Sequence, residues 1–140
     1  MFNSPASSSG YPRHLAQMYH RVGVETGVAA ASPHALTMML LDGFVGAVKH
    51  ARKAMTAGRI EDKGRHIGHA ARILDEGLKA PLNLQAGGEL AANLRDLYDY
   101  TLVRLLHANR HNDDAALKEV LSLIEPIRES WAAIGAQFPT

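Results

Sequence analysis

The chain has 140 residues, of which 46% are hydrophobic, and 15 Lys and Arg stand against 14 Asp and Glu, which gives a formal net charge of +1. This length favours one domain, and the balanced charge argues against a protein that binds mainly nucleic acid, for which a strongly basic surface is expected. The absence of cysteine excludes disulfides, thiolate metal sites and a cysteine nucleophile. It also fits a cytoplasmic protein.

The N-terminal part of the chain differs in composition from the rest. Residues 1–12 are rich in Ser, Pro and Gly, which predicts a flexible arm. Residues 13–31 are predicted to form a cap segment and connector: a short helix with Tyr19 on its apolar side, then a stretch containing two glycines. Residues 32–137 are predicted to form the folded bundle domain.

The first long helix has clear start and stop signals. Ser32 is a good N-cap, because its hydroxyl accepts a hydrogen bond from a free backbone N–H, and Pro33 suits the first helical position because it has no N–H to leave unpaired. Gly58 is a typical residue after a helix end. The pattern predicts a helix over 33–57.

Three more helices are expected in chain order. The second covers 59–80, and an uncharged linker over 81–88 separates it from the third, over 89–111. The fourth covers 114–136, and Pro126 is expected to bend it. Four helices of similar length joined by short loops predict an all-α fold, an antiparallel four-helix bundle. The apolar stretch over 38–48 is too short to span a membrane.

Helical periodicity predicts one core stripe on each helix. For the last three helices, the residues expected in the core include Ile60, Ile67, Leu74 and Leu78; Leu90, Leu94, Leu97, Thr101 and Leu105; and Leu117, Ile124, Trp131 and Ile134.

Two helices carry apolar residues beyond their core stripe. This second apolar arc contains Met38, Leu41, Val45 and Val48 in the first helix and Leu102, Val103 and Leu106 in the third. One interpretation is deeper burial, under the arm or a dimer partner. The other is an exposed groove for another protein, because large apolar patches mark interaction sites and an amphipathic helix in such a groove is a common recognition mode. Both hold if the arm covers the groove until a partner displaces it.

Eight histidines raise the question of a metal site. His66 and His69 are three residues apart, and His107 and His111 are four apart, so each pair lies on one helix face. No Glu is followed three residues later by His, so the Glu-x-x-His motif of di-iron bundles is missing. We therefore expect no metal and no cofactor.

Catalytic motifs are also missing. Asp99 lies in an apolar helix, opposite its core stripe, and is expected to face solvent or to pair with Arg95. No Ser, His and Asp arrangement has motif support, and Gly87–Gly88 lacks the longer glycine pattern and lysine of a phosphate-binding loop. We expect that the protein is not an enzyme.

The chain resembles a known family over about residues 18–132. The resemblance depends on the order of four segments, followed by Trp131: MYHRVGVETG, SPHALTMMLLDG, GGELAANLRDLYDYTLVRLLHAN and NDDAALKEV. In these features the chain is similar to the flagellin-specific export chaperones of bacterial flagella, the FliS family.

The resemblance implies a cytoplasmic chaperone that binds the C-terminal segment of newly made flagellin. Such a chaperone prevents premature polymerisation and presents flagellin to the membrane-embedded export gate; an anti-sigma factor is a further candidate partner. No nucleic acid and no membrane insertion are implied. The segment with the tyrosine is expected to lie over part of the binding surface.

Combining this tyrosine with the second apolar arc, we expect the partner to contact Tyr19, Leu41, Val45, Val48, Leu102 and Leu106. The alternative is a structural homodimer that buries the arc against its own copy.

Overall fold

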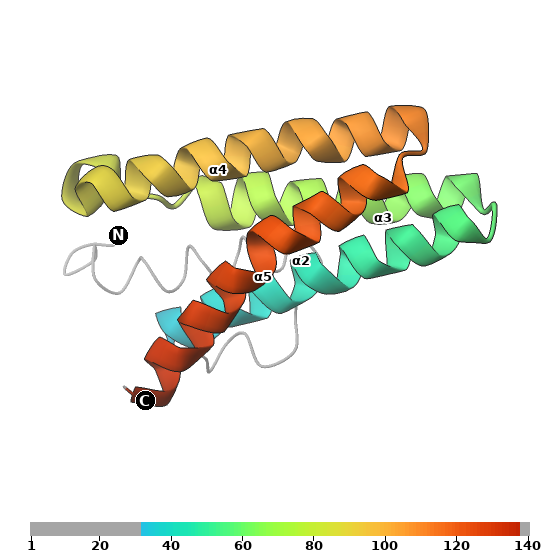
Figure 1. The fold of residues 1–140 in the computed structure, drawn as a ribbon. Coiled ribbons are helices and arrows are strands. Elements are labelled where there is room, and N and C mark those ends of the chain that lie inside the picture. The colour runs from blue at the N-terminus through green and yellow to red at the C-terminus, as the bar shows by residue number, and fades with distance from the viewer. Residues whose placement is uncertain (1–31, 138–140) are drawn as a thin grey trace, which may run out of the picture.

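The computed structural model describes residues 32–137, which form an all-α bundle and contain no strand (Figure 1). The elements are α2 (Pro33–Thr56), α3 (Ile60–Arg72), the π-helical segment η2 (Ile73–Lys79), α4 (Leu84–His111) and α5 (Asp114–Gln137). The predicted fold class is confirmed. The predicted arm over 1–12 and the cap segment over 13–31, with Tyr19, lie outside the described residues.

Successive helices run in opposite directions, with α3 and η2 following one another as one rod (Figure 1). Both α2 and α4 contact the rod of α3 and η2 on one side and α5 on the other. The last turns of α5 lie beside the first turns of α2 at one end of the bundle (Figure 1). Among the described residues, no helix is long and apolar enough to cross a membrane.

The predicted ends of the first helix are confirmed. Ser32 Oγ accepts a hydrogen bond from the backbone N–H of Ala35 at 3.1 Å, and Pro33 occupies the first turn. After α2, Gly58 adopts a φ of +76°, which glycine reaches without steric cost. At the other turn, Asn112 takes the left-handed conformation and Asp113 accepts a hydrogen bond from the N–H of Ala116.

The second predicted helix ends as expected but changes its winding. From Ile73 onward it is π-helical, with five-residue hydrogen-bonded turns. Gly77 lies in this segment, directly against α2: a Cβ added there would be 2.8 Å from Leu40 Cδ1. The missing side chain therefore allows η2 to pack closely on α2.

The third helix differs from the prediction in its start and its rotation. It begins at Leu84 rather than residue 89, and Gly88 interrupts its geometry with φ +57° and ψ −133°. Leu90 was expected in the core but is 70% exposed, whereas Ala91 and Tyr98 are buried. The first half of the predicted stripe was therefore placed about one residue too early, because residue spacing does not show which side of the helix meets the bundle. The second half is confirmed, since Thr101 and Leu105 are fully buried.

Two other predicted core residues are exposed. Ile60 and Ile134 are about half exposed because they lie near the free ends of α3 and α5, where fewer neighbouring helices cover them. The middle of both predicted stripes is confirmed, since Ile67, Leu74 and Ile124 are fully buried.

The second apolar arc of α2 is buried. The exposed fraction is 1% for Leu41, 7% for Val45 and 0% for Val48, and all three belong to the same core cluster as the predicted stripe. The reason is that α2 packs on η2 and α3 as well as on α5. The interpretation of this arc as an exposed groove is therefore wrong, and deeper burial explains it.

One charged side chain lies within the bundle. Lys63 of α3 is 3% exposed, and its Nζ donates to the carbonyl oxygen of Asn109 at 2.8 Å and to Oδ1 of Asn112 at 2.6 Å. The ammonium group thus meets the negative end of α4, where a cation is favoured. These hydrogen bonds compensate for the cost of burying its charge.

The close approach of η2 to α2 gives a matched pair of substitutions. Gly77→Ala places a methyl group against Leu40, so we expect a loss of about 1–3 kcal/mol of unfolding free energy. Gly68→Ala meets nothing within 4 Å, so it should add up to about 1 kcal/mol through helix propensity. Urea denaturation of both variants tests this; equal effects would show that Gly77 is not held against α2.

Candidate functional site: an apolar pocket

A pocket of about 330 Å³ opens where the four rods of the bundle meet. It lies near the start of α2, the end of η2, the first half of α4 and the last turns of α5. Its walls are mostly apolar side chains, and its lining comprises Pro33, His34, Thr37, Leu41, Gly77, Leu78, Pro81, Leu82, Leu94, Tyr98, Ile127 and Trp131. A cavity of this size is within the range of ligand-binding pockets.

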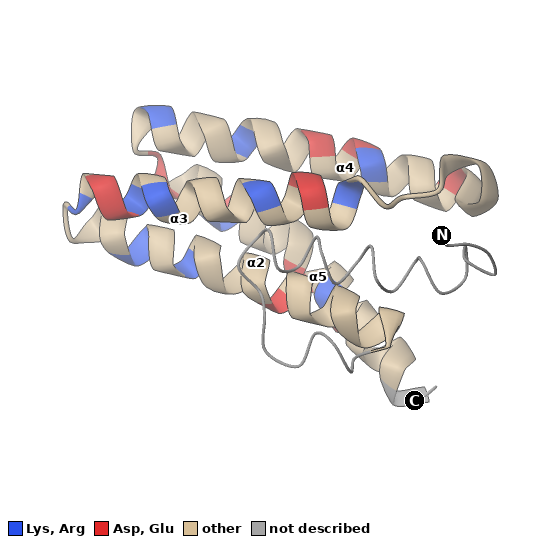
Figure 2. Cartoon of the chain, turned by 180° about the vertical axis from the view of Figure 1, so that it is seen from behind, with Lys and Arg blue, Asp and Glu red and all other residues tan. Residues whose placement is uncertain are grey.

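Three of the segments around the pocket carry no formal charge. Residues 33–41, 80–88 and 130–137 contain no Asp, Glu, Lys or Arg, and each range contains or adjoins pocket residues. Seen from behind, this end of the bundle is largely tan, whereas both signs of charge alternate along α3 (Figure 2). The pocket therefore favours apolar contact over attraction of a charged ligand.

His34 and Trp131 join α2 to α5 at the wall of the pocket. Their rings stack with 5.2 Å between centroids and a 5° interplanar angle. Trp131 Nε1 donates to the carbonyl oxygen of His34 at 3.2 Å, and His34 Nε2 lies 2.6 Å from the carbonyl oxygen of Trp131. Gly135 leaves room for the imidazole, because a Cβ there would clash with it. Pro126 lies within α5, which continues past it as a helix. The contact between His34 and Trp131 fixes the position of α5 after this proline.

Two ion pairs hold the other walls in place. Lys79 Nζ of η2 lies 2.6 Å from Asp99 Oδ1 of α4, and Arg128 of α5 pairs with Asp42 of α2. Each charged residue directly follows a pocket residue in sequence. The hydrogen bond that Lys79 donates to Asp99 raises the pKa of Lys79, and the hydrogen bond that Arg128 donates to Asp42 raises the pKa of Arg128. The pairs therefore connect adjacent walls while their charges stay outside the lining.

The pairing of Asp99 corrects one expectation. Asp99 was expected to face solvent or pair with Arg95. Its side chain is 47% exposed, in agreement with the first alternative, but its ion-pair partner is Lys79 from the neighbouring rod. Arg95 instead contacts Asp96 at 3.2 Å. The partner of Asp99 is set by helix packing, which the spacing within one helix does not show.

Tyr98 carries the most buried polar group in the pocket. It is 4% exposed, and burial raises the pKa of its phenol to about 12. Within residues 32–137, no hydrogen bond to its hydroxyl is present, so the phenol contributes to the pocket mainly as an apolar ring with one unpaired donor.

Of the residues predicted to contact a partner, the three in α2 have different positions. Leu41 lines the pocket although only 1% of it is exposed. Val45 and Val48 point into the core away from the pocket lining. A charged substitution at either valine would therefore unfold the bundle rather than test a partner surface.

The predicted residues of α4 lie outside the pocket. Leu106 is 62% exposed and Leu102 is half-buried against the core. With Val103, which is 61% exposed, they form an apolar patch on the outer side of α4. The structure thus separates the predicted set into a pocket residue, two core residues and a patch; Tyr19 is outside the described residues.

Several pocket residues were missed by the sequence reasoning. Leu78 was predicted only as a core residue, Tyr98 was given no role, and His34 was noted only as one of eight histidines. The signals available were the SPHALTMMLLDG segment, which supplies four lining residues, and the late Trp131, both of which carried the family resemblance.

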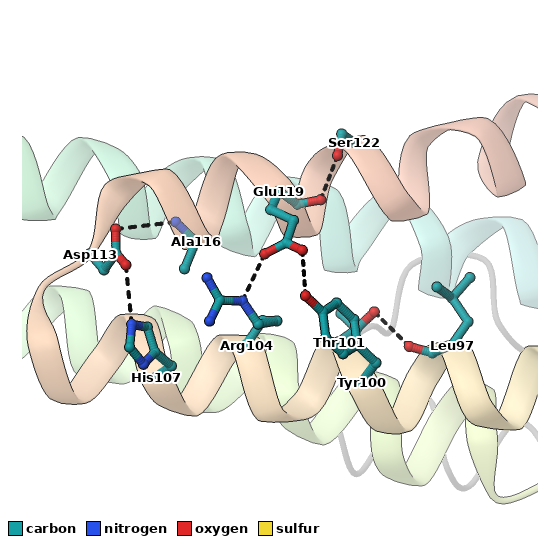
Figure 3. A network of polar contacts seen from close by, with 9 residues as sticks. All are labelled: Leu97, Tyr100, Thr101, Arg104, His107, Asp113, Ala116, Glu119 and Ser122. Carbon is teal, nitrogen blue, oxygen red and sulfur yellow. Dashed lines mark hydrogen bonds and ion pairs between the residues drawn. The ribbon is translucent and has the colours of Figure 1, made fainter.

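A second polar cluster connects α4 and α5 away from the pocket (Figure 3). Glu119 accepts from Tyr100 Oη at 2.5 Å and from Arg104 Nε at 2.7 Å, and these hydrogen bonds lower the pKa of Glu119. His107 Nε2 lies 3.1 Å from Asp113 Oδ2. No group of three or more His, Cys, Asp or Glu side chains that could hold a metal ion occurs within the described range.

The fold and the pocket define a helical bundle with an uncharged apolar recess formed by all of its rods. Residues 15–138 match the family described as "Flagellar protein FliS". The flagellar secretion chaperone FliS of Salmonella typhimurium is 46% identical over 116 residues, covering 83% of this chain and 86% of that protein. The flagellar secretion chaperone FliSB of Pseudomonas aeruginosa is 38% identical over 124 residues, covering 89% and 98%. The chain belongs to the FliS family.

The buried phenol gives a pH-dependent prediction. Because the pKa of Tyr98 is about 12 in the folded state and about 10 in an unfolded chain, its contribution to stability is full below pH 10 and is lost as the pH rises toward 12. Relative to Tyr98→Phe, the wild type should lose about 1–2 kcal/mol of unfolding free energy between about pH 9 and pH 11. Denaturant titrations at both pH values measure this difference.

Tyr100→Phe is the matched control at neutral pH. It removes a hydroxyl that donates to Glu119 and should cost about 0.5–1.5 kcal/mol. Tyr98→Phe should cost nothing or stabilise, since its hydroxyl has no partner within residues 32–137. A larger neutral-pH loss for Tyr98→Phe than for Tyr100→Phe would contradict this description of the pocket.

Proposed function

We propose that this protein is a cytoplasmic flagellar export chaperone that binds the C-terminal segment of flagellin and anchors apolar side chains of that segment in the pocket. Holding the segment prevents premature polymerisation, and the complex is then delivered to the membrane-embedded export gate. Membership of the FliS family, whose curated relatives are named flagellar secretion chaperones, is the observation that carries this proposal. The function requires no catalytic group.

The pocket supports this function through its size and chemistry. A volume of about 330 Å³ can accept one or two large apolar side chains. Each Leu-sized side chain that becomes buried contributes about 1.5–3 kcal/mol. Ordering a segment that is disordered before binding offsets part of this gain. A few anchors therefore give an affinity that is useful and still reversible, as an export chaperone needs.

The patch on α4 supports a second contact. Leu106 follows Leu102 and Val103 by four and three residues, one helical turn, and Val103 and Leu106 are more than 60% exposed. An extended, partly helical partner can reach both the pocket and this patch along α4. We propose Leu41 as a contact inside the pocket and Leu102 and Leu106 as contacts of the patch, with the Tyr19 segment as a cover that the partner displaces.

The pocket rim offers two half-buried positions for a test of this proposal. Thr37 and Leu82 both line the pocket and are half-buried. A carboxylate at either site would have to be desolvated when an apolar partner enters. We expect Thr37→Glu and Leu82→Glu to weaken binding of a synthetic flagellin C-terminal peptide at least tenfold, measured by isothermal titration calorimetry.

Thr56→Glu is the matched control, because Thr56 is an exposed threonine at the other end of α2 and does not line this pocket. It should bind the peptide like the wild type, and all three variants should keep their helical circular dichroism. Normal binding by both rim variants would reject the pocket as the anchor site, and no binding by the wild type would reject the proposed function.

The exposed patch makes a separate prediction. Leu106→Glu should leave folding intact, since the side chain is 62% exposed. It should weaken peptide binding by less than the rim variants do. Sedimentation with and without peptide measures this and also tests the homodimer alternative. A wild-type monomer that forms a one-to-one complex with the peptide supports the proposal. A wild-type dimer that does not bind the peptide, and that becomes a monomer in Leu106→Glu, supports the alternative.

A further inference from the structure

Three histidines line a recess that the proposed function does not use. His50 of α2 and His66 and His69 of α3 line a recess of about 450 Å³ between the two helices, with Gly43 and Gly46 in its wall. It shares no lining residue with the apolar pocket. His50 is exposed and His66 half-buried, so both imidazoles can be reached from solvent.

The distance between two of these rings fits a shared metal ion. The ring centroids of His50 and His66 are 5.2 Å apart, and the rings are tilted by 46°. A Zn²⁺ ion that binds two imidazole nitrogens at about 2.0–2.1 Å with a tetrahedral angle holds the ring centroids about 5 Å apart. The two side chains come from neighbouring antiparallel helices, so helix packing itself maintains this separation.

The charge state of the site suits a metal ligand. Imidazole binds metals through a neutral ring nitrogen. Arg65, which also lines the recess, donates to Asp62 Oδ1 at 2.8 Å, and this contact partly neutralises its charge.

We propose that His50 and His66 bind a divalent transition-metal ion of the Zn²⁺ type and thereby connect α2 to α3. Imidazole is a preferred ligand for Zn²⁺, Ni²⁺ and Cu²⁺. Two protein ligands are fewer than the three or four of catalytic and structural zinc sites, so water completes the coordination and the affinity is lower than in those sites. This agrees with the absence of any three-donor cluster in the described part of the chain.

A metal bound in this way stabilises the folded chain. The two ligands are 16 positions apart in sequence and meet only when α2 and α3 pack together. An ion that binds the folded state more tightly than the unfolded chain raises the unfolding temperature with increasing concentration. The site thus provides a metal-dependent constraint between two helices.

The test uses the full chain without an affinity tag, after treatment with EDTA. Zn²⁺ binding is measured by isothermal titration calorimetry, and thermal unfolding is followed at increasing Zn²⁺ concentration. We expect one Zn²⁺ per chain at this site and a rise in unfolding temperature. His50→Gln and His66→Gln should each weaken the affinity at least tenfold and remove the rise.

His107→Gln/His111→Gln is the matched control. These rings have centroids 4.6 Å apart on a single helix, so a Zn²⁺ ion bound to them connects no two helices. This variant should keep the Zn²⁺-dependent rise in unfolding temperature. The proposal is overturned if the wild type shows no rise, if His50→Gln and His66→Gln respond like the wild type, or if only the control variant loses the response. Circular dichroism without metal confirms that each variant is folded.

Discussion

The burial of α2 is the constraint on which the rest of the structure depends. Nine of its side chains are buried, and they lie on two arcs rather than one stripe. A helix with so little polar surface needs neighbours on more than one side. The rod of α3 and η2 meets one side and α5 meets another, and Gly77 removes the side chain that would keep η2 away. The positions of three elements thus follow from the composition of one helix.

The same constraint explains where the pocket lies. Along the middle of α2 the neighbours close over Phe44 and Val48 and leave them fully buried. Beside the N-terminal end of α2 lies the part of α5 that follows Pro126. The rod of α3 and η2 also ends here, and the chain turns toward α4 from Pro81 onward. Beside the core packing, the helices are held there by specific side-chain contacts, namely His34 with Trp131 and two ion pairs. The recess is what remains between them.

The sequence predicts the helices of this protein well and the faces of the helices less well. Capping at Ser32, the turn at Asn112 and the family motifs are local signals, and the structure confirms the helices they delimit. The exposed Leu90 and the buried Val48 were misjudged because a helical wheel gives relative angles within one helix. It does not show how many neighbours the helix has, and for α2 that number decides burial.

Sites formed by residues from several helices could not be predicted from residue spacing within one helix. The pocket joins His34 to Trp131, which are 97 positions apart, and the pair His50 and His66 comes from two helices. Sequence reasoning examined histidines three or four positions apart, because these are the pairs that one helix brings together. It did recover the region of the pocket, since the segment from Pro33 to Leu41 carried the family resemblance, but not the residues that face it.

The charge distribution bears on how the proposed partner would be held. An interface built on ion pairs weakens mainly when salt screens it, whereas apolar contact in an uncharged recess changes little with ionic strength. The ranges 33–41, 80–88 and 130–137 contain no charged residue. Lys79 and Arg128, which directly follow lining residues in sequence, are already paired within the protein. An apolar anchor bound as proposed would therefore be held by the walls themselves. The wall formed by α5 after Pro126 is attached to α2 by the stacked rings of His34 and Trp131, by the hydrogen bond from Trp131 Nε1 to His34 and by the ion pair of Arg128 with Asp42.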